Sequence, residues 1–504
     1  MNSSGLFTSM SDATPSPNRP KLSITCSSQN KQQKRGSQRK AAQQSPTRPR
    51  TKYASTPPRP AFKPKMKAVL LSRFAAFHIL TDIITRHKML ADAMAAHQPL
   101  SDLGPRDRNF ARLLIATSLR RHGQITGLLE PLITPQTDTP TRIILMIGVA
   151  QLVFVGTEAH ASINTSVELA KHLLPPRRSG MVNAVLRRLQ RELDDRLGAT
   201  NMVDNLPCEL AARWLDAWGE DELTKLASHA IAIPPLDIAV KTDVSFWAET
   251  LGGQVLNNQI IRCPTLGDIR ALPGYYEGAW WVQDVAAALP VQLLTAANNG
   301  SLNGKFVLDL CAAPGGKTAQ LAAAGAEICA VDKDSTRLSV LKENLNRLSL
   351  TADIIEADIL DFTPAQQADH IILDAPCSAT GTFRRHPDIF LHKTAPDLKL
   401  LQQTQIALLK ASLDWVKDDG TLIYITCSLQ PEEGEEVVET VLNAGHARLL
   451  PFSIAELGIF SRALHSQGWA RILPSCLDHI NAGHEQTGTG CDGFFIARLQ
   501  PVRS

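Results

Sequence analysis

Apolar residues follow two different spacings along the chain, one in its first half and another in its last third. Between about residues 67 and 192 they recur at intervals of three and four, as in AVLLSRFAAFHILTDII and RNFARLLIATSLRR, which indicates amphipathic helices. Prolines such as Pro105 and Pro135 fall between these segments and mark helix ends. We therefore predict an all-helical domain over residues 66–205.

Residues 206–300 show both spacings and predict a small mixed α/β module. The stretch LPCELAARWLDAWGEDELTKLASHA favours helix, whereas PLDIAVKT and GQVLNNQIIRC favour short strands. From Gly304 onward, short apolar runs alternate with amphipathic segments, which is typical of a parallel sheet covered on both faces. The chain is thus expected to be multidomain and to end in a Rossmann-like α/β domain over residues 301–504, whose ligands would bind beyond the carboxyl ends of its strands.

Basic residues concentrate in the first 65 positions. This segment holds thirteen Lys and Arg and one acid, Asp12, in a chain of net charge +3, so residues 66–504 carry a net charge of −9. Its Ser, Pro, Gln and Lys content, with few large apolar residues, predicts a disordered tail. Such a tail would attract nucleic-acid phosphates without reading sequence. Competing interpretations are an incidental extension, a start codon assigned upstream of Met66, and an organelle transit peptide.

The composition argues against several classes of protein. No run of eighteen apolar residues predicts a membrane span, and the N-terminus lacks a secretory pattern. Nine cysteines without a CxxC pair predict free thiols in a reducing compartment and no metal site. We expect a cytoplasmic protein, monomeric and without a membrane partner.

The first strands of the last domain are followed by polar residues suited to a nucleoside ligand. The turn Cys311–Lys317 is rich in small residues and precedes a helix, so backbone amides can approach a ligand. Asp332, at the end of the second strand, suits a ribose diol, and Asp358, at the expected end of the third, suits an adenine amine. The turn is neither GxxxxGK[ST] nor GxGxxG, which disfavours a nucleoside triphosphate or NAD.

Two thiols follow the next two strands at the same edge of the predicted sheet. The fourth strand ends at Asp374, close to Cys377, and the fifth ends at Cys427. A thiolate that adds to carbon 6 of a pyrimidine makes carbon 5 nucleophilic toward a sulfonium methyl group. Asp374 would stabilise charge at N3 if burial in a dry pocket raised its pKa. These residues alone leave open which thiol attacks.

At this point the chain resembles a known family. CAAPGGKT, DAPCSATG, RRHPD, TCSLQPEE and CDGFF resemble the motifs of the RsmB-type, or Sun/Fmu-type, ribosomal RNA cytosine-5 methyltransferases, and SINTSVELAK and GMVNAVLRR resemble their NusB-like RNA-binding domain. The resemblance extends from about residue 67 to the end. It implies S-adenosyl-L-methionine as the methyl donor and a cytosine of small-subunit (16S) ribosomal RNA as the target.

The resemblance also implies roles for individual residues. Cys427 matches the nucleophile, and Cys377 matches the residue that assists release of the methylated product. With Asp374 these thiols form the implied catalytic set. The implied donor contacts are Cys311, Ala312, Ala313, Pro314, Gly315, Gly316, Lys317, Asp332, Asp358 and Asp374. The family commonly has Asn where this chain has Gly434, and Gly where it has Cys491.

Contact with RNA is expected from two further regions. The predicted helix SGMVNAVLRRLQRE carries Arg187, Arg188 and Arg191, and the charge pattern suits either RNA phosphates or a solvated helix face. The 206–300 module is expected to bind RNA or to serve as a linker. Three alternatives stay open, namely a cytosine-5 methyltransferase of transfer RNA, a non-catalytic NusB-like RNA-binding factor, and a protein methyltransferase, which would not need a pyrimidine-attacking thiol.

Overall fold

The computed structural model describes residues 66–264, 267–392, 395–480 and 489–503. The predicted disordered tail lies outside the described residues. Seven of the cysteines in the described part are free thiols, as expected; Cys208 is not among them.

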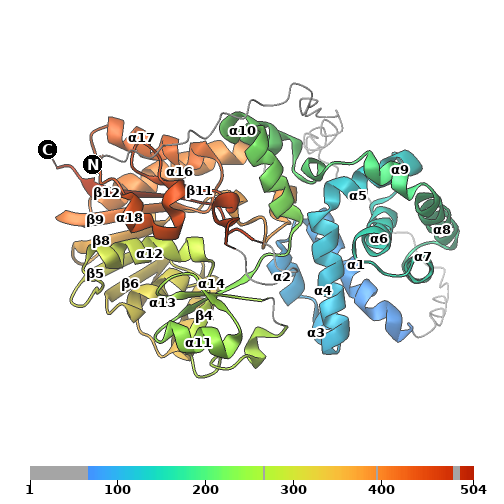
Figure 1. The fold of residues 1–504 in the computed structure, drawn as a ribbon, viewed down its shortest axis with the longest axis horizontal. Coiled ribbons are helices and arrows are strands. Elements are labelled where there is room, and N and C mark those ends of the chain that lie inside the picture. The colour runs from blue at the N-terminus through green and yellow to red at the C-terminus, as the bar shows by residue number, and fades with distance from the viewer. Residues whose placement is uncertain (1–65, 265–266, 393–394, 481–488, 504) are drawn as a thin grey trace, which may run out of the picture. The chain divides into compact units, whose positions relative to one another are not determined.

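The first part of the described chain is helical, as the three-and-four spacing predicts. Its elements are α1 (Ala68–Arg86), α2 (Leu90–Ala95), α3 (Gln98–Ser101), α4 (Pro105–Arg120), α5 (His122–Leu129), α6 (Thr139–Val149), α7 (Ala159–Leu173), α8 (Pro176–Arg191) and α9 (Leu193–Gly198) (Figure 1). Their apolar faces meet in one core that includes Leu80, Leu114, Ile147 and Leu186. Helix α1 is long and apolar enough to cross a membrane, but half of its apolar window is buried in the protein, which assigns it to this core.

A four-stranded antiparallel sheet follows the helical part. Its strands are β1 (Leu236–Val240), β2 (Gln254–Val255), β3 (Ile260–Cys263) and β4 (Trp280–Val282), in the order β2-β3-β1-β4. The accompanying helices are α10 (Cys208–Ile231), α11 (Val244–Leu251) and α12 (Val285–Ala297). The mixed α/β module predicted here is therefore present, and we keep 66–205, 206–300 and 301–504 as proposed domain bounds.

The last part is built on a sheet with the order β10-β12-β9-β8-β5-β6-β7, and β11 pairs with β12. Its strands are β5 (Phe306–Leu310), β6 (Glu327–Asp332), β7 (Asp353–Glu356), β8 (Ala368–Asp374), β9 (Val416–Thr426), β10 (Ala447–Leu449), β11 (Ala470–Ile472) and β12 (Phe494–Pro501). Strands β5 to β9 pair in parallel. Strand β12 pairs with β9 antiparallel. The sheet is therefore mixed, whereas the sequence predicted a parallel one.

Helices cover both faces of this sheet (Figure 1). α12, α13 (Gly316–Ala323), α14 (Ser335–Leu348) and α18 (Ile454–Leu457) share one core with Ile372 and Ile423. α16 (Ala395–Leu413) and α17 (Glu435–Asn443) share the other with Leu373 and Tyr424. Successive strand residues thus enter opposite cores, because side chains alternate across a strand. The fold class predicted from the sequence is confirmed.

A carboxyl group lies inside the central strand β5. Asp309 is fully buried, and its Oδ2 accepts a hydrogen bond of 2.6 Å from the Thr318 hydroxyl on α13. Its Oδ1 has no hydrogen-bond partner among the described residues. Burial raises the pKa of Asp309 to about 7, against the opposing effects of Thr318 and Lys317.

This raised pKa predicts a pH dependence of stability. Between an unfolded-state pKa near 3.9 and the folded value of about 7, folding takes up a proton. The stabilisation is complete below the lower pKa and is lost as the pH rises through the higher one, by at most about 1.4 kcal/mol per pH unit. Asp309→Asn should flatten the pH profile of the free energy of unfolding between pH 5 and 8, measured by urea denaturation. Asp414→Asn, at an exposed carboxyl, is the control; parallel profiles for all three proteins would contradict the prediction.

Candidate active site

A cavity of about 400 Å³ opens at the carboxyl ends of β5 to β9. Six residues singled out from the sequence line it: Cys311, Asp332, Asp358, Asp374, Cys377 and Cys427. The lining residues that the sequence did not point to are Lys333, Asp334, Arg337, Ala357, Ile359, Leu360, Ala375, Pro376, Ala379, Thr404 and Leu408. These follow the same strand ends or lie on α14 and α16; Ala375, Pro376 and Ala379 belong to the DAPCSATG motif, and no motif marked the others.

The two carboxylates at the far end of the cavity are held by backbone amides. Asp332 ends β6, and its carboxylate accepts hydrogen bonds from Ala313 N at 3.1 Å and Asp334 N at 3.0 Å. Asp358 lies two residues beyond the end of β7, slightly later than predicted, and caps a short 3-10 turn by accepting from Leu360 N at 3.1 Å. Fixed carboxylates that border a cavity are suited to accept hydrogen bonds from ligand hydroxyl and amino groups.

The turn Cys311–Lys317 divides between two surfaces. Cys311 borders the cavity, whereas Pro314, Gly315 and Gly316 line a separate groove of about 800 Å³. Four arginines line this groove: Arg108, Arg112, Arg270 and Arg347. The side chains of Arg112 and Arg270 are exposed and form no hydrogen bond or ion pair within the described part of the chain. The groove therefore presents free positive charge beside the turn.

Lys317 points toward the end of the cavity where Asp374 and Cys427 lie. Its ammonium forms an ion pair of 2.8 Å with Asp374 Oδ2 and lies 5.6 Å from the centre of the Phe494 ring. Burial opposes a charge on Lys317, but Asp374, Asp309 and Cys427 outweigh it and raise the pKa of Lys317. Asp374, whose side chain is 31% exposed, therefore has a cation beside it and not the isolated dry pocket envisaged for it. The structure adds Lys317 as the proton-bearing member of this pair.

The two thiols lie in contact. Cys377 and Cys427 follow β8 and β9, and their sulfur atoms are 3.3 Å apart. The hydrogen bond with Cys427, together with burial and the nearby charge of Glu433, raises the pKa of Cys377 well above its usual value. Cys377 therefore keeps its proton at neutral pH.

The two cysteine-bearing loops are joined through backbone contacts. Gly381 N donates to Cys427 O at 2.9 Å, and Gly493 N donates to Gly381 O at 2.9 Å. A Cβ atom at Gly381 would lie 2.0 Å from Gly493 O. Only glycine permits this approach, which brings the loop after Cys377 against both Cys427 and the CDGFF motif.

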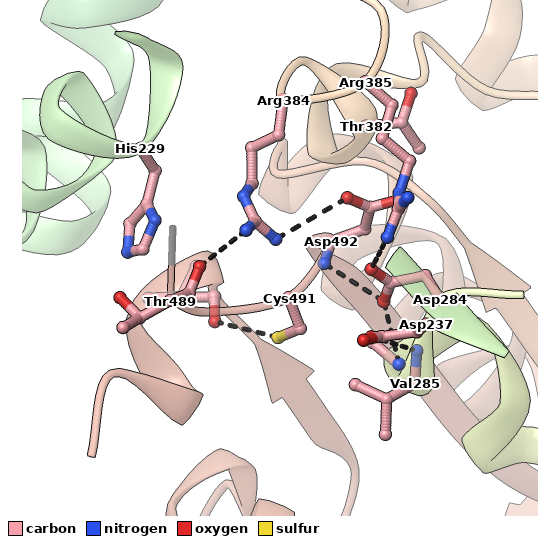
Figure 2. Close-up of polar contacts among 12 residues, drawn as sticks. His229, Asp237, Asp284, Val285, Thr382, Arg384, Arg385, Thr489, Cys491 and Asp492 are labelled. Atoms are coloured by element: carbon pink, nitrogen blue, oxygen red, sulfur yellow. Dashed lines mark hydrogen bonds and ion pairs between the residues drawn. The ribbon is translucent and has the colours of Figure 1, made fainter. Parts of the chain in front are cut away.

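Buried charges lie behind these loops. Figure 2 shows Arg385 between Asp284 and Asp492, with distances of 2.7 Å to Asp284 and 3.0 Å to Asp492, and Arg384 donating to the Thr489 carbonyl at 2.6 Å. Asp492 N also donates to Asp284 Oδ1 at 3.1 Å. The RRHPD motif is thereby tied to the CDGFF motif and, through Asp284, to the start of α12.

The two departures from the family pattern are accommodated. A Cβ atom at Gly434 would lie 2.5 Å from the Arg471 guanidinium, which pairs with Glu435, so glycine leaves room for this ion pair. The Cys491 side chain is buried, and its sulfur lies 3.8 Å from Leu473 O. Neither residue lines the cavity.

Comparisons with known proteins agree with this geometry. Residues 297–500 match the family model described as 16S rRNA methyltransferase RsmB/F, and residues 71–191 match the NusB family. A ribosomal RNA small subunit methyltransferase B from Vibrio vulnificus is 32% identical over 397 residues, which are 73% of this chain and 90% of the relative. The chain belongs to the RsmB/F family of ribosomal RNA methyltransferases.

Other members of this RsmB/F family show the same extent of similarity. The proteins of the same name from Pseudomonas putida and Xanthomonas campestris are 34% and 32% identical, and the alignments cover 73% and 86% of this chain and 88% and 97% of the relatives. The crystal structure of PH0851 has a TM-score of 0.63 at 20% identity and covers 87% of this chain and all of that chain, which shows a shared fold. The family resemblance inferred from the motifs is confirmed.

Gly381 is crowded and Gly180 is not, so replacing each with alanine should have opposite effects on stability. Gly381→Ala should destabilise the protein by about 1–3 kcal/mol, because its new methyl group meets backbone atoms that cannot rotate away. Gly180→Ala, in α8 with nothing within 4 Å of its Cβ, should stabilise by about 0.5–1 kcal/mol. Urea denaturation measures both. A neutral or stabilising effect of Gly381→Ala would contradict the close approach.

Proposed function

We propose that this S-adenosyl-L-methionine-dependent RNA methyltransferase modifies carbon 5 of a cytosine in small-subunit (16S) ribosomal RNA through a covalent bond to Cys427. The observation that supports this most directly is the pair of sulfur atoms 3.3 Å apart in a cavity that also holds Asp332, Asp358 and Asp374. Addition to a pyrimidine and release from it act on neighbouring ring carbons. Two sulfurs in contact suit that geometry, whereas methyl transfer to protein would need neither.

The donor fits the acidic end of the cavity. We propose that Asp332 accepts from its ribose hydroxyls and that Asp358 accepts from its adenine amine, while Cys311 borders it. Neither carboxylate needs to move, because backbone amides hold both in place. When bound, the donor supplies an electrophilic methyl group. Of the remaining members of the turn, Ala313 holds Asp332 through its backbone amide, whereas Pro314, Gly315 and Gly316 line the separate arginine-bearing groove.

The surroundings of the two thiols support different roles. Cys377 keeps its proton because its pKa is raised, whereas Cys427 lies near the Lys317 ammonium. The thiolate is the nucleophilic form of cysteine, so a Cys377 that keeps its proton is unsuited to attack. Cys427 is therefore proposed as the attacking sulfur.

The reaction would then proceed in three steps. The Cys427 sulfur bonds to carbon 6, and the displaced electron pair moves toward N3, where the Lys317 ammonium stabilises it while Asp374 holds that ammonium in place. Carbon 5 next forms its bond to the methyl group, whose bond to the sulfonium sulfur breaks with the electron pair going to that sulfur. Loss of the carbon-5 proton to a base finally restores the double bond and expels the Cys427 sulfur. Cys377, the second sulfur within reach, is proposed to assist this release.

The two thiols are distinguished by single replacements. Cys427→Ala should lower methyl transfer from labelled donor to unmodified ribosomal RNA on the order of a thousandfold or more. Cys377→Ala should still form the bond to RNA but release it slowly, so that a protein–RNA adduct persists on a denaturing gel. Cys329→Ala, at a buried thiol of β6 outside the cavity, is the control.

The same assay separates the competing functions. Turnover by Cys427→Ala equal to that of the wild type would remove the assigned nucleophile. No transfer by the wild type would favour a non-catalytic NusB-like RNA-binding factor. Transfer to transfer RNA in preference to ribosomal RNA would favour the transfer-RNA alternative.

RNA contact is proposed along two basic surfaces. One is the groove that holds Arg112, and the other is the exposed edge of α8, where Arg191 forms no ion pair with any described residue. Arg112→Gln or Arg191→Gln should weaken RNA binding and reduce the slope of log K against log salt by about 0.7–0.9, the value expected for one phosphate contact. Arg448→Gln on β10 is the control. An unchanged slope in both variants, measured by filter binding, would exclude these surfaces.

A further inference from the structure

A buried carboxylate connects the turns that carry the two thiols. Glu433 lies in a 3-10 turn (Pro431–Glu433) that follows β9, and it is fully buried. Its Oε2 accepts from the hydroxyls of Ser378 and Ser428, each at 2.5 Å. Ser378 directly follows Cys377, and Ser428 directly follows Cys427. One carboxylate oxygen therefore holds the residues next to both sulfurs.

The second oxygen strengthens the same connection. Glu433 Oε1 accepts from Ser378 N at 2.8 Å and from Gln405 Nε2 at 3.1 Å, and Gln405 also donates to Pro376 O at 2.9 Å. Four donors converge on one carboxylate, which uses its full acceptor capacity. An amide in this place would turn an NH₂ group toward donors.

A merely structural role does not account for the choice of residue. Burying a carboxylate is costly unless it is paired, and within the described part of the chain Glu433 forms no ion pair. The nearby guanidinium of Arg471 pairs with Glu435 and donates to Ser428 O. An apolar side chain would fill the space more cheaply but could not tie two separate turns together.

We propose that Glu433 is a positioning residue for methyl transfer: its carboxylate fixes the separation of the two cysteine-bearing turns, so that Cys377 stays within reach of a ring bonded to Cys427. The part concerning release of the RNA rests on the proposed function. The part concerning the separation of the sulfurs does not. Neither the strand pattern nor the thiols pointed to Glu433; only its place in TCSLQPEE marked it.

The separation of the sulfurs is tested without RNA. Phenylarsine oxide condenses with two neighbouring thiols, forming two As–S bonds and releasing water. The wild type should bind one equivalent in the cavity, detected by intact mass and by loss of two titratable thiols, and Cys377→Ala should not. Glu433→Gln keeps the size of the side chain and should weaken this binding about tenfold, because the turns are no longer held together.

The matched control is Glu432→Gln. Glu432 is the neighbouring carboxylate, pairs with Arg213 and contacts neither turn, so this variant should bind the arsenical like the wild type. Ser428→Ala is the second test variant, since it keeps the buried carboxylate and removes only one tether. If Glu433→Gln fails to fold, as judged by urea denaturation, Ser428→Ala decides the outcome.

Release of RNA is tested in a single turnover with labelled donor. Glu433→Gln and Ser428→Ala should raise the ratio of denaturant-resistant adduct to free methylated RNA and lower turnover by about tenfold to a hundredfold. Glu433→Asp, which keeps the acceptors on a shorter stem, should recover part of the release rate. Arsenical binding and adduct ratios equal to those of the wild type in a folded variant would overturn the positioning role. Neither methylated RNA from the wild type nor an adduct from Cys377→Ala, with the arsenical result as expected, would instead count against the proposed function alone.

Discussion

The parallel pairing of β8 with β9 determines where the chemistry of this protein can take place. In that register Asp374 lies opposite Ile425, and Ala375 N still donates to Ile425 O at 2.9 Å. Both strands therefore leave the sheet at the same edge, and each is followed by a cysteine within three residues of the last pair, Asp374 and Ile425. The ladder of hydrogen bonds brings the two loops to the same edge of the sheet, and the side chains that connect the two turns act within that register.

The buried charges behind the loops extend this constraint beyond the sheet. Arg385 is held between Asp284, which caps α12, and Asp492, which precedes β12. Burial raises the pKa of Asp492 to about 7, with the charge of Asp284 as a further cause and the two arginines opposing it. Removing one member would leave the others buried without compensation, which is costly. The loop after Cys377 thus depends on residues contributed by three separate segments.

The sequence predicted those parts of the fold that local patterns encode. Short apolar runs alternating with helices identified the strands, and the rule that ligands bind at their carboxyl ends located Asp332, Asp374 and both thiols on one cavity. The insertion of β12 beside β9 could not be predicted, because an antiparallel partner contributed from the chain end leaves no local signal. The direction of Lys317 and the role of Glu433 depend on contacts between distant segments, and motif spacing does not report such contacts.

Chemical asymmetry between the two sulfurs arises from what surrounds each turn and not from the thiols themselves. Glu433 contributes negative charge on the Cys377 side, while the Lys317 ammonium contributes positive charge near Cys427. The raised pKa of Cys377 keeps the proton on that sulfur, which accords with the proposed attack by Cys427. The carboxylate proposed to position the thiols is therefore also one of the causes that raise the pKa of Cys377.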